Sequence, residues 1–422
     1  MNYLKSGLAC ILVSSMWAAF ALMASFYGWW MSPVVETGDA AGFSQFTREQ
    51  LTRKNQGNSA FLMIENGEVF DSGYFSAAGA NPVDAETMFS LASMSKWVTA
   101  IGVMLLVEQG KLDLDKPVNH YLTRWKLPDH EFSNPVLVRH LLSHTSGLED
   151  GLGFGDYDLD EDLPTLEESL AEPRASGSQG VRLVISVEPG TEFNYSGGGY
   201  LILQLLIEEV SGKGFVDFIQ QQIFDPLNMQ RSTFVYSQND SNTSPSFDVN
   251  GEVAISYKYA VAAATGLSAS ASDLGRLSLA MMPANRSHLT RVSENMRVAA
   301  GLMFGLPLWG LGEILYAETN LGDFVYGHDG ANEPAINTAL RINPDTNDAI
   351  IVLVTGHKRL ATYIGYEWVL WQTGYPDVLS TNLVISSSVR PMLIGLFLIV
   401  ASFLFHGWFT RPTMNHSGTR VI

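Results

Sequence analysis

Two long stretches without a charged residue, one near each end of the chain, constrain its fold more than any other feature. They cover residues 8–31 and residues 392–408. Each has roughly the length that a helix needs to cross a bilayer, about 17 to 25 residues, and each carries tryptophan near its end, as membrane interfaces favour. We therefore expect a transmembrane helix at each end, with both termini on one side of the membrane.

The flanks of the first stretch predict its orientation. Lys5 precedes it and acidic residues follow it. Because positive residues stay in the cytoplasm, the N-terminus should lie inside, and the middle of the chain outside the cytoplasmic membrane. A cleaved signal peptide is the alternative, but Leu22-Met23-Ala24 lacks the small residue expected two places before the alanine. We favour an uncleaved anchor in residues 1–40.

The second stretch could instead be a buried helix of the globular part. Arg390 and Arg411 flank it and a polar tail follows, which favours a membrane helix. Pro391 lies at its expected start, where the first turn of a helix tolerates proline. We expect this helix and a short tail in residues 381–422, and one domain in residues 41–380.

Composition narrows the function of that domain. The chain has 422 residues, of which 46% are hydrophobic, enough for one large or two medium domains. A net charge of −18 argues against a nucleic-acid partner, which would require a basic face. The one cysteine, Cys10, excludes an internal disulfide and a cysteine metal cluster.

Ser93 and Lys96 form a Ser-x-x-Lys pair ahead of apolar residues at helical spacing. Residues three apart lie on one face of a helix, so the two side chains can meet. A lysine amine can take the proton of a serine hydroxyl when burial and nearby charge lower its pKa. Gly110 predicts the end of this helix, and Ser93 should lie in its first turn. Alone, the pair could equally mark an ordinary surface helix.

Strand patterns lie on both sides of a long helical region. Asn66-Gly67 between two apolar runs predicts a β-hairpin. Residues from about 110 to 250 have helical spacing with few strands. Later strands are expected at residues 323–326, 335–342 and 349–355. This order predicts an α+β fold, with an antiparallel sheet flanked by helices, an inserted all-helical domain and a cleft between them.

Two groups of possible metal ligands have simpler interpretations. His140 and His144 have a spacing that zinc sites use, but the glutamate of the metalloprotease pattern is missing, so packing and helix capping explain them better. Residues 149–172 are rich in acidic residues but lack the glycine and terminal glutamate of a calcium loop. We expect a solvated acidic loop near the mouth of the site, without a metal or other cofactor.

Five stretches in this order resemble the serine β-lactamase and penicillin-binding-protein-like hydrolases. The resemblance is to the branch with class C β-lactamases, DD-peptidases, D-aminopeptidases and β-lactamase-fold esterases, and it runs from about residue 43 to 375. The matching stretches are residues 89–96, 139–148, 189–212, 264–277 and 327–330. As a set they are specific, whereas each alone would prove little.

The resemblance implies a role for each matching residue. Ser93 matches the acylated nucleophile and Lys96 the base that activates it. From the residues alone, Tyr195, on the turn before an amphipathic helix, could relay a proton or be an ordinary core tyrosine; the resemblance matches it to the tyrosine that passes a proton to the leaving group. The implied reaction is acyl transfer through a covalent acyl-enzyme, followed by attack of water.

The third motif of the family is replaced here by His328-Asp329-Gly330, where lactamases carry Lys-Thr-Gly. The resemblance places the oxyanion hole at the backbone N–H groups of Ser93 and Ala331. Two such donors typically contribute about a hundredfold or more each to the rate.

Two departures affect the expected substrate. The second motif has Gly197 where the family often has asparagine, which removes an amide that holds β-lactams and peptides. The third has His328 in place of lysine, as in the esterase and aminopeptidase branches, and neutral imidazole binds a carboxylate less well than ammonium does. Both changes favour an ester or a small amide or peptide with D-residues.

We therefore expect a membrane-anchored serine hydrolase with its catalytic domain on the periplasmic or extracellular side. A DD-carboxypeptidase or β-lactamase is one alternative. A non-hydrolysing penicillin-binding-like membrane sensor or scaffold is another. The oligomeric state is open.

Overall fold

The computed structural model describes most of the chain, in two compact units. The described residues are 2–150, 156–174, 183–235, 240–255, 257–303 and 305–409. One unit combines residues 1–33 and 374–422, and the other is residues 34–373. The larger unit holds all the candidate site residues.

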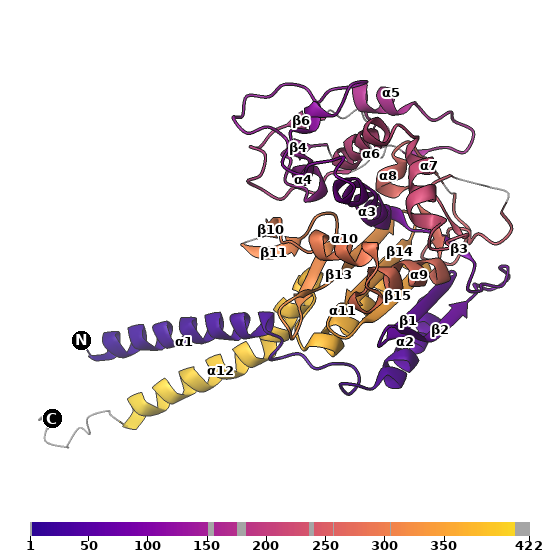
Figure 1. Cartoon of the computed structure of the whole chain (residues 1–422). Helices are drawn as coiled ribbons and strands as arrows, with labels where there is room; N and C mark the ends of the chain where they lie inside the picture. Colours follow the sequence, from indigo (N-terminus) through magenta and orange to yellow (C-terminus); the bar gives the residue numbers. More distant parts are fainter. Residues whose placement is uncertain are drawn as a thin grey trace, which may run out of the picture. The chain divides into compact units, whose positions relative to one another are not determined.

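An eight-stranded antiparallel sheet forms the base of the larger unit (Figure 1). Its strand order is β10-β11-β12-β13-β14-β15-β1-β2, so the first strands of the chain pair with the last, β1 with β15. The strands are β1 (Ser59–Glu65), β2 (Glu68–Phe75), β10 (Gly301–Met303), β11 (Leu306–Trp309), β12 (Ile314–Glu318), β13 (Phe324–Asn332), β14 (Ile336–Asn343) and β15 (Asp348–Thr355). This confirms the predicted antiparallel sheet on both sides of an insert.

Local chemistry explains the first hairpin. Asn66 and Gly67 join β1 to β2 with φ angles of 53° and 78°. A two-residue turn with both φ values positive matches the twist of paired strands, and asparagine and glycine adopt such values at least cost. The predicted hairpin is therefore confirmed.

Helices cover both faces of the sheet. On one face, α2 (Ala40–Lys54) and α11 (Leu360–Thr373) pack together, and Gly365 of α11 lies against Arg341 of β14. On the other, α9 (Ala271–Met281) packs on β1 through Gly275 and Leu62, with α10 (His288–Met296) beside it. Alternation along the strands separates the two sets of contacts.

The insert between β2 and β10 carries most other helices (Figure 1). Helix α3, Ser95–Glu108, is buried over most of its length and packs on α6, α8 and α10. The remaining helices are α4 (Val138–Leu142), α5 (Leu166–Ala171), α6 (Gly197–Ser211), α7 (Phe215–Ile219) and α8 (Ala262–Thr265), with short turns η1 (Ala92–Met94), η2 (Val118–His120), η3 (Gln220–Phe224) and η4 (Pro283–Asn285). The α+β prediction is confirmed.

Short strands accompany these helices. A three-stranded sheet has the order β3-β9-β7, and two separate pairs are β4 with β6 and β5 with β8. Their bounds are β3 (Met88–Ser90), β4 (Leu148–Glu149), β5 (Asp156–Tyr157), β6 (Val184–Ile185), β7 (Ser232–Thr233), β8 (Lys258–Tyr259) and β9 (Ser268–Ser270). The sequence pattern missed them because segments of two or three residues carry no recognisable alternation.

One predicted helix is shorter than expected. The pattern from Val138 to Leu148 predicts a helix ending at Gly147, but α4 ends at Leu142. His144 has a left-handed backbone (φ 56°), which a helix cannot continue through, and Gly147 has φ 75° in the loop beyond.

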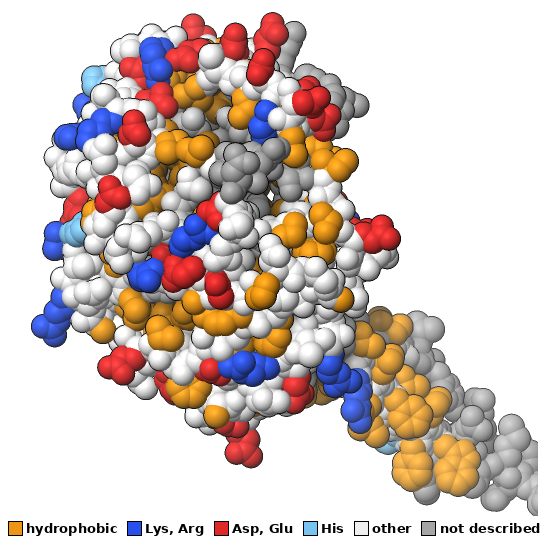
Figure 2. Space-filling view, turned by 90° about the vertical axis from the view of Figure 1, so that its right-hand side faces the viewer, with side chains coloured by type: hydrophobic (Ala, Val, Ile, Leu, Met, Phe, Trp, Pro, Cys, Tyr) orange, Lys and Arg blue, Asp and Glu red, His pale blue; other side chains and the backbone are white. Residues whose placement is uncertain are grey.

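The smaller unit is a pair of long helices, α1 (Asn2–Phe26) and α12 (Thr381–Phe409), preceded at α12 by the turn η5 (Val378–Ser380). Both are long and apolar enough to cross a membrane, a criterion that signal sequences and core helices also meet. Hydrophobic side chains cover the part of this pair visible in Figure 2. The predicted position of Pro391 is wrong, because α12 begins ten positions earlier and contains it. The indole N–H of Trp17 lies 3.3 Å from the carbonyl oxygens of Pro391 and Met392.

Candidate active site

Ser93 lies in a tight turn between β3 and α3. The turn, η1, follows Ser90 and leads directly into α3 at Ser95, so Ser93 precedes the helix proper instead of lying in its first turn as predicted. The Ser95 hydroxyl donates to the carbonyl of Ala92 (2.6 Å) and accepts the N–H of Leu267 (2.9 Å). Ala92 has a left-handed φ of 47°. This backbone, unusual for alanine, directly precedes the half-buried Ser93.

Lys96 lies one helical turn further on and is almost fully buried, with 2% of its surface exposed. Its Nζ donates to the carbonyl of Ala264 (3.1 Å) and lies 4.9 Å from the ring centre of Tyr195. The ring of Tyr200 is 5.7 Å away. The structure therefore brings Lys96 and Tyr195 together, as the sequence predicts.

Tyr195 comes from the loop that enters α6. Ser196 caps that helix by accepting the N–H of Gly199 with its hydroxyl (2.8 Å), and Gly197 begins it. The Tyr195 ring lies 4.3 Å from the ring of His144 and 5.6 Å from that of Trp309. Aromatic rings therefore fix the plane of the phenol.

His328 faces the helices from β13 and is 1% exposed. Its Nδ1 donates to the carbonyl of Asp329 (2.5 Å), which leaves the Nε2 lone pair as an acceptor. Burial, followed by the charge of Lys96, lowers the pKa of His328 to about 4. The imidazole is therefore neutral at physiological pH.

Gly330 allows β13 to touch the turn that carries Ser93. A Cβ on Gly330 would lie 2.1 Å from the carbonyl oxygen of Leu91 and 2.4 Å from Oγ1 of Thr338. No side chain fits there, so the close approach requires glycine. Ala331, the next residue, is exposed at the end of the strand. The two backbone segments expected to form the oxyanion hole are therefore neighbours, through Leu91 and Gly330.

The middle residue of the third motif points the other way. Asp329 accepts from the hydroxyl of Tyr316 (3.0 Å) and is paired with the fully buried guanidinium of Arg341. Because successive side chains alternate across a strand, Asp329 lies on the opposite face from His328. The motif therefore contributes His328 to the candidate site and Asp329 to the ion pair on the opposite face of the sheet.

Several residues of the site escaped the sequence analysis. Trp309 lies edge-on to His144 (4.8 Å) and His328 (5.3 Å), but it comes from the four-residue strand β11 and belongs to no motif. Ala264 contributes only its carbonyl, which its residue type cannot reveal. Glu313 is fully buried, accepts from the indole of Trp97 (3.2 Å), and has a pKa raised to about 8 by burial.

The possible metal ligands do not form a site in the described part of the chain. His140 accepts the N–H of Leu137 at the start of α4 (3.3 Å), whereas His144 accepts that of Ser196 (3.0 Å). No group of three or more His, Cys, Asp or Glu side chains among the described residues could hold a metal ion. Part of the acidic loop, residues 151–155, lies outside the described residues.

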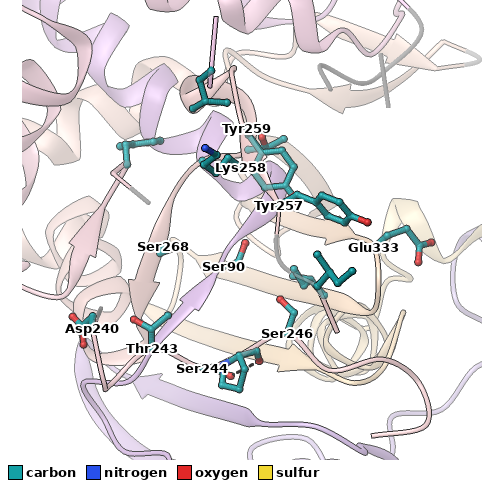
Figure 3. Close-up of a pocket in the computed structure, with 17 residues that line it drawn as sticks. Ser90, Asp240, Thr243, Ser244, Ser246, Tyr257, Lys258, Tyr259, Ser268 and Glu333 are labelled. Carbon is teal, nitrogen blue, oxygen red and sulfur yellow. Dashed lines mark hydrogen bonds between the residues drawn. The ribbon is translucent and has the colours of Figure 1, made fainter. Parts of the chain in front are cut away.

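A cavity of about 300 Å³ is lined by Ser90, at the end of β3 that leads into the turn of Ser93 (Figure 3). Three of its lining residues are close in sequence to candidate site residues. Ser90 is three residues before Ser93, and Glu333 is two residues after Ala331. Gly266 is two residues after Ala264, whose carbonyl binds Lys96. Its polar lining is mainly hydroxyls, from Ser90, Thr243, Ser244, Ser246, Tyr257, Tyr259, Thr265 and Ser268. Its position and lining would suit the non-reacting part of a substrate.

Charged groups at this cavity already have partners. Asp240 pairs with Arg231 (2.6 Å), and Glu333, at the edge of the view in Figure 3, pairs with Lys358 (2.8 Å). Lys258 donates to the carbonyl of Glu161. The two acidic side chains at the cavity are therefore ion-paired, whereas Lys258, bonded to a neutral carbonyl, keeps its positive charge.

Comparisons with known proteins agree with this arrangement. A penicillin-binding protein of Bacillus subtilis is 34% identical over 194 residues, which are 45% of this chain and 40% of that protein. Esterase EstB of Burkholderia gladioli is 28% identical over 208 residues, 44% of this chain and 49% of the esterase. The chain thus matches less than half the length of these relatives.

Fold and family comparisons cover much more of the chain. An octameric penicillin-binding protein homologue from Pyrococcus abyssi has a TM-score of 0.65 at 26% identity, over 80% of this chain and 78% of that one. The sequence model of the family described as Beta-lactamase matches residues 43–370. The chain therefore belongs to the beta-lactamase family, a family of serine hydrolases.

Proposed function

We propose that this chain is a membrane-anchored serine hydrolase that forms an acyl-enzyme on Ser93. Lys96 accepts the proton of the Ser93 hydroxyl, whose oxygen attacks the carbonyl carbon of the substrate. Tyr195 passes a proton to the leaving group as its bond to that carbon breaks. Water then attacks the ester on Ser93, releases the acid and restores the hydroxyl.

The surroundings of Lys96 carry this proposal. The amine is buried one helical turn after Ser93, fixed by a carbonyl at 3.1 Å, and 4.9 Å from the Tyr195 ring. Burying a lysine ammonium costs free energy unless the charge is paired, so a buried lysine without a carboxylate partner in the described part of the chain suggests a functional role. A proton path from serine to lysine to tyrosine supplies one.

The oxyanion formed during attack would be stabilised by the N–H groups of Ser93 and Ala331. Support comes from the contact between their backbone segments, at Leu91 and Gly330. Donors held by the fold need no reorganisation during the reaction, and removal of one such donor typically costs about 10²–10³ in kcat.

The proposed substrate is an ester, or a small amide or peptide with D-residues. His328 is neutral, Gly197 has no side-chain amide, and the adjacent cavity is lined mainly by hydroxyls. Together these features favour a neutral substrate over one held by its carboxylate. The two relatives described above have names that point to the same two possibilities, one an esterase and the other a penicillin-binding protein.

A labelling and turnover series tests the function. Full-length protein in detergent is treated with a fluorescent fluorophosphonate, a fluorescent penicillin and a panel of p-nitrophenyl esters and D-alanyl amides. We expect Ser93-dependent labelling and ester turnover, both lost in Ser93→Ala and retained in Ser76→Ala, an exposed serine outside the site. Slow release of bound penicillin would favour the DD-carboxypeptidase alternative. Absence of any Ser93-dependent labelling would favour the sensor or scaffold.

Membrane anchoring rests on the two terminal helices. Their mutual packing, with Trp17 bonded to carbonyls of α12, supports retention of α1 over its removal as a signal peptide. With two spans and the N-terminus inside, as Lys5 predicts, the hydrolase domain would lie on the periplasmic or extracellular side. Protease added to intact spheroplasts should cleave the domain, and resistance to it would contradict this orientation.

A further inference from the structure

His144 lies against the candidate site without a role in the proposed reaction. It is fully buried, although it has the left-handed φ of 56° that non-glycine residues rarely adopt. Such a backbone persists only where surrounding contacts hold it, and it is often found where a site must be positioned. The contacts of His144 identify what it holds.

Three contacts join His144 to the loop of Tyr195. Its carbonyl accepts the N–H of Asn194 (2.7 Å), the residue before the tyrosine. Its Nδ1 accepts the N–H of Ser196 (3.0 Å), the residue after it. Its ring lies 4.3 Å from the Tyr195 ring, with 33° between the planes. One residue thus contacts both flanks and the side chain of the tyrosine.

The protonation state of His144 is defined by these contacts. Because Nδ1 accepts a hydrogen bond, the proton of the neutral ring is on Nε2. Nε2 has no hydrogen-bond partner within the described ranges, so of the two ring nitrogens only Nδ1 bonds to the loop. Burial, followed by the charge of Lys96, lowers the pKa of His144 well below its usual value, so Nδ1 stays free to accept.

We propose that His144 is a positioning residue that holds Tyr195 beside Lys96 through its carbonyl and its Nδ1. The inference rests on the proposed role of Tyr195 as proton relay. A displacement of about 1 Å in such a group can cost about 10²-fold in rate.

Two substitutions separate the nitrogens of the imidazole. In His144→Asn, the side-chain oxygen can take the place of Nδ1, and asparagine tolerates a left-handed backbone. In His144→Gln, the amide reaches the place of Nε2 but leaves the Ser196 N–H without its acceptor. His144→Gly keeps the backbone free of strain but removes the Nδ1 acceptor, and His140→Asn is the control on the same segment.

Turnover of an aryl ester and of an alkyl ester by the full-length protein is the measurement, with Tyr195→Phe as reference. Because a basic alkoxide needs a proton more than a phenolate does, loss of Tyr195 positioning should lower kcat more for the alkyl ester. We expect the kcat of His144→Asn and of His140→Asn to stay within about threefold of wild type. For His144→Gln and His144→Gly we expect kcat on the alkyl ester to fall about 10²-fold, with KM little changed.

The outcomes distinguish this inference from the proposed function. If Tyr195→Phe is severely impaired but His144→Gln and His144→Gly turn over the alkyl ester normally, the positioning role is wrong and the relay stands. If Tyr195→Phe is fully active, the relay itself is wrong. Two other results would also overturn the positioning role. One is a loss of kcat in the His144 variants that is equal for both esters and follows a lowered Tm. The other is a larger loss of kcat in His144→Asn than in His144→Gln.

Discussion

The two faces of β13 differ in the charge of their side chains. On the face toward the helices, His328 is neutral and contacts the edge of Trp309. On the face toward α11, Asp329 is ionically paired with Arg341 and bonded to Tyr316. Two adjacent residues of one strand thus serve different purposes.

This difference shows how one motif can anchor a strand through one side chain and present another side chain to the candidate site. The charged face fixes β13 through a buried pair, whose geometry tolerates little movement. The neutral face can then present an imidazole and, at Gly330, a close backbone approach to the Ser93 turn. Each prediction below perturbs one face and leaves the other in place.

The largest effect should come from the charged face. Asp329→Ala removes the carboxylate that faces the buried Arg341, and loss of one partner of a buried pair typically costs about 3–5 kcal/mol. Glu333→Ala, four residues on, breaks the exposed pair with Lys358 and should cost about 0–1 kcal/mol. Urea unfolding measures both, and equal losses would show that the pair beneath β13 does not support it.

On the neutral face, His328 should make stability depend on pH. Its pKa falls from 6.5 to about 4 on folding, so between these values the unfolded chain binds more protons and stability rises with pH. The difference amounts to about 3 kcal/mol, at about 1.4 kcal/mol per pKa unit. His328→Asn keeps a donor for the Asp329 carbonyl but does not titrate.

The measurement is the free energy of unfolding of wild type minus that of His328→Asn, from pH 4 to 7. We expect this difference to become more favourable to wild type as pH rises. The raised pKa of Glu313 acts in the opposite direction, lowering stability as pH rises from 4.5 to about 8, but it is common to both proteins and cancels. A flat difference would mean that His328 is not held neutral by burial.

Gly330, on the same face of β13 as His328, should show the next effect, because it touches the turn that carries Ser93. Gly330→Ala forces a methyl against the Leu91 carbonyl, and overpacking of this kind typically costs about 1–3 kcal/mol. Movement of β13 should also reduce acylation of Ser93. Gly214→Ala is the control, since its Cβ would meet only a side-chain oxygen at 3.8 Å. Full labelling in Gly330→Ala would argue against a close approach.

The smallest effect should come from Tyr316→Phe. It deletes one hydrogen bond to Asp329 and leaves the ring beneath the guanidinium of Arg341, 3.6 Å away. A hydrogen bond to a charged group contributes about 1.5–3 kcal/mol and a neutral one about 0.5–1.5; with Arg341 in place we expect about 1 kcal/mol. Thermal unfolding measures it, and a loss as large as that of Asp329→Ala would show that the hydroxyl, not the guanidinium, anchors the carboxylate.

The sequence predicted those parts that depend on local chemistry or on a motif. Asn66-Gly67 indicated the first hairpin because few residues accept its backbone, and Ser93 with Lys96 indicated one helix face. Tyr195 and His328 were found through the resemblance and lie near Lys96, although their roles remain proposals.

The missing parts depend on distant contacts. Trp309 and the carbonyl of Ala264 enter the site only after the chain folds, and neither belongs to a pattern. The left-handed backbone of His144 depends on its bonds to the loop of Tyr195, fifty residues away in sequence, so the local pattern favoured a longer helix. Pro391 was placed at the start of α12 because hydropathy shows where a helix is apolar, not where it begins.

The central claim is that the Ser93 oxygen becomes covalently acylated during turnover. Full-length wild type and Ser93→Ala are mixed with a p-nitrophenyl ester, quenched in acid during the steady state and mapped by peptide mass spectrometry. The account predicts an acyl group on Ser93 in wild type and none anywhere in the variant. An acyl group on another residue, or turnover by Ser93→Ala at the wild-type rate, would contradict it.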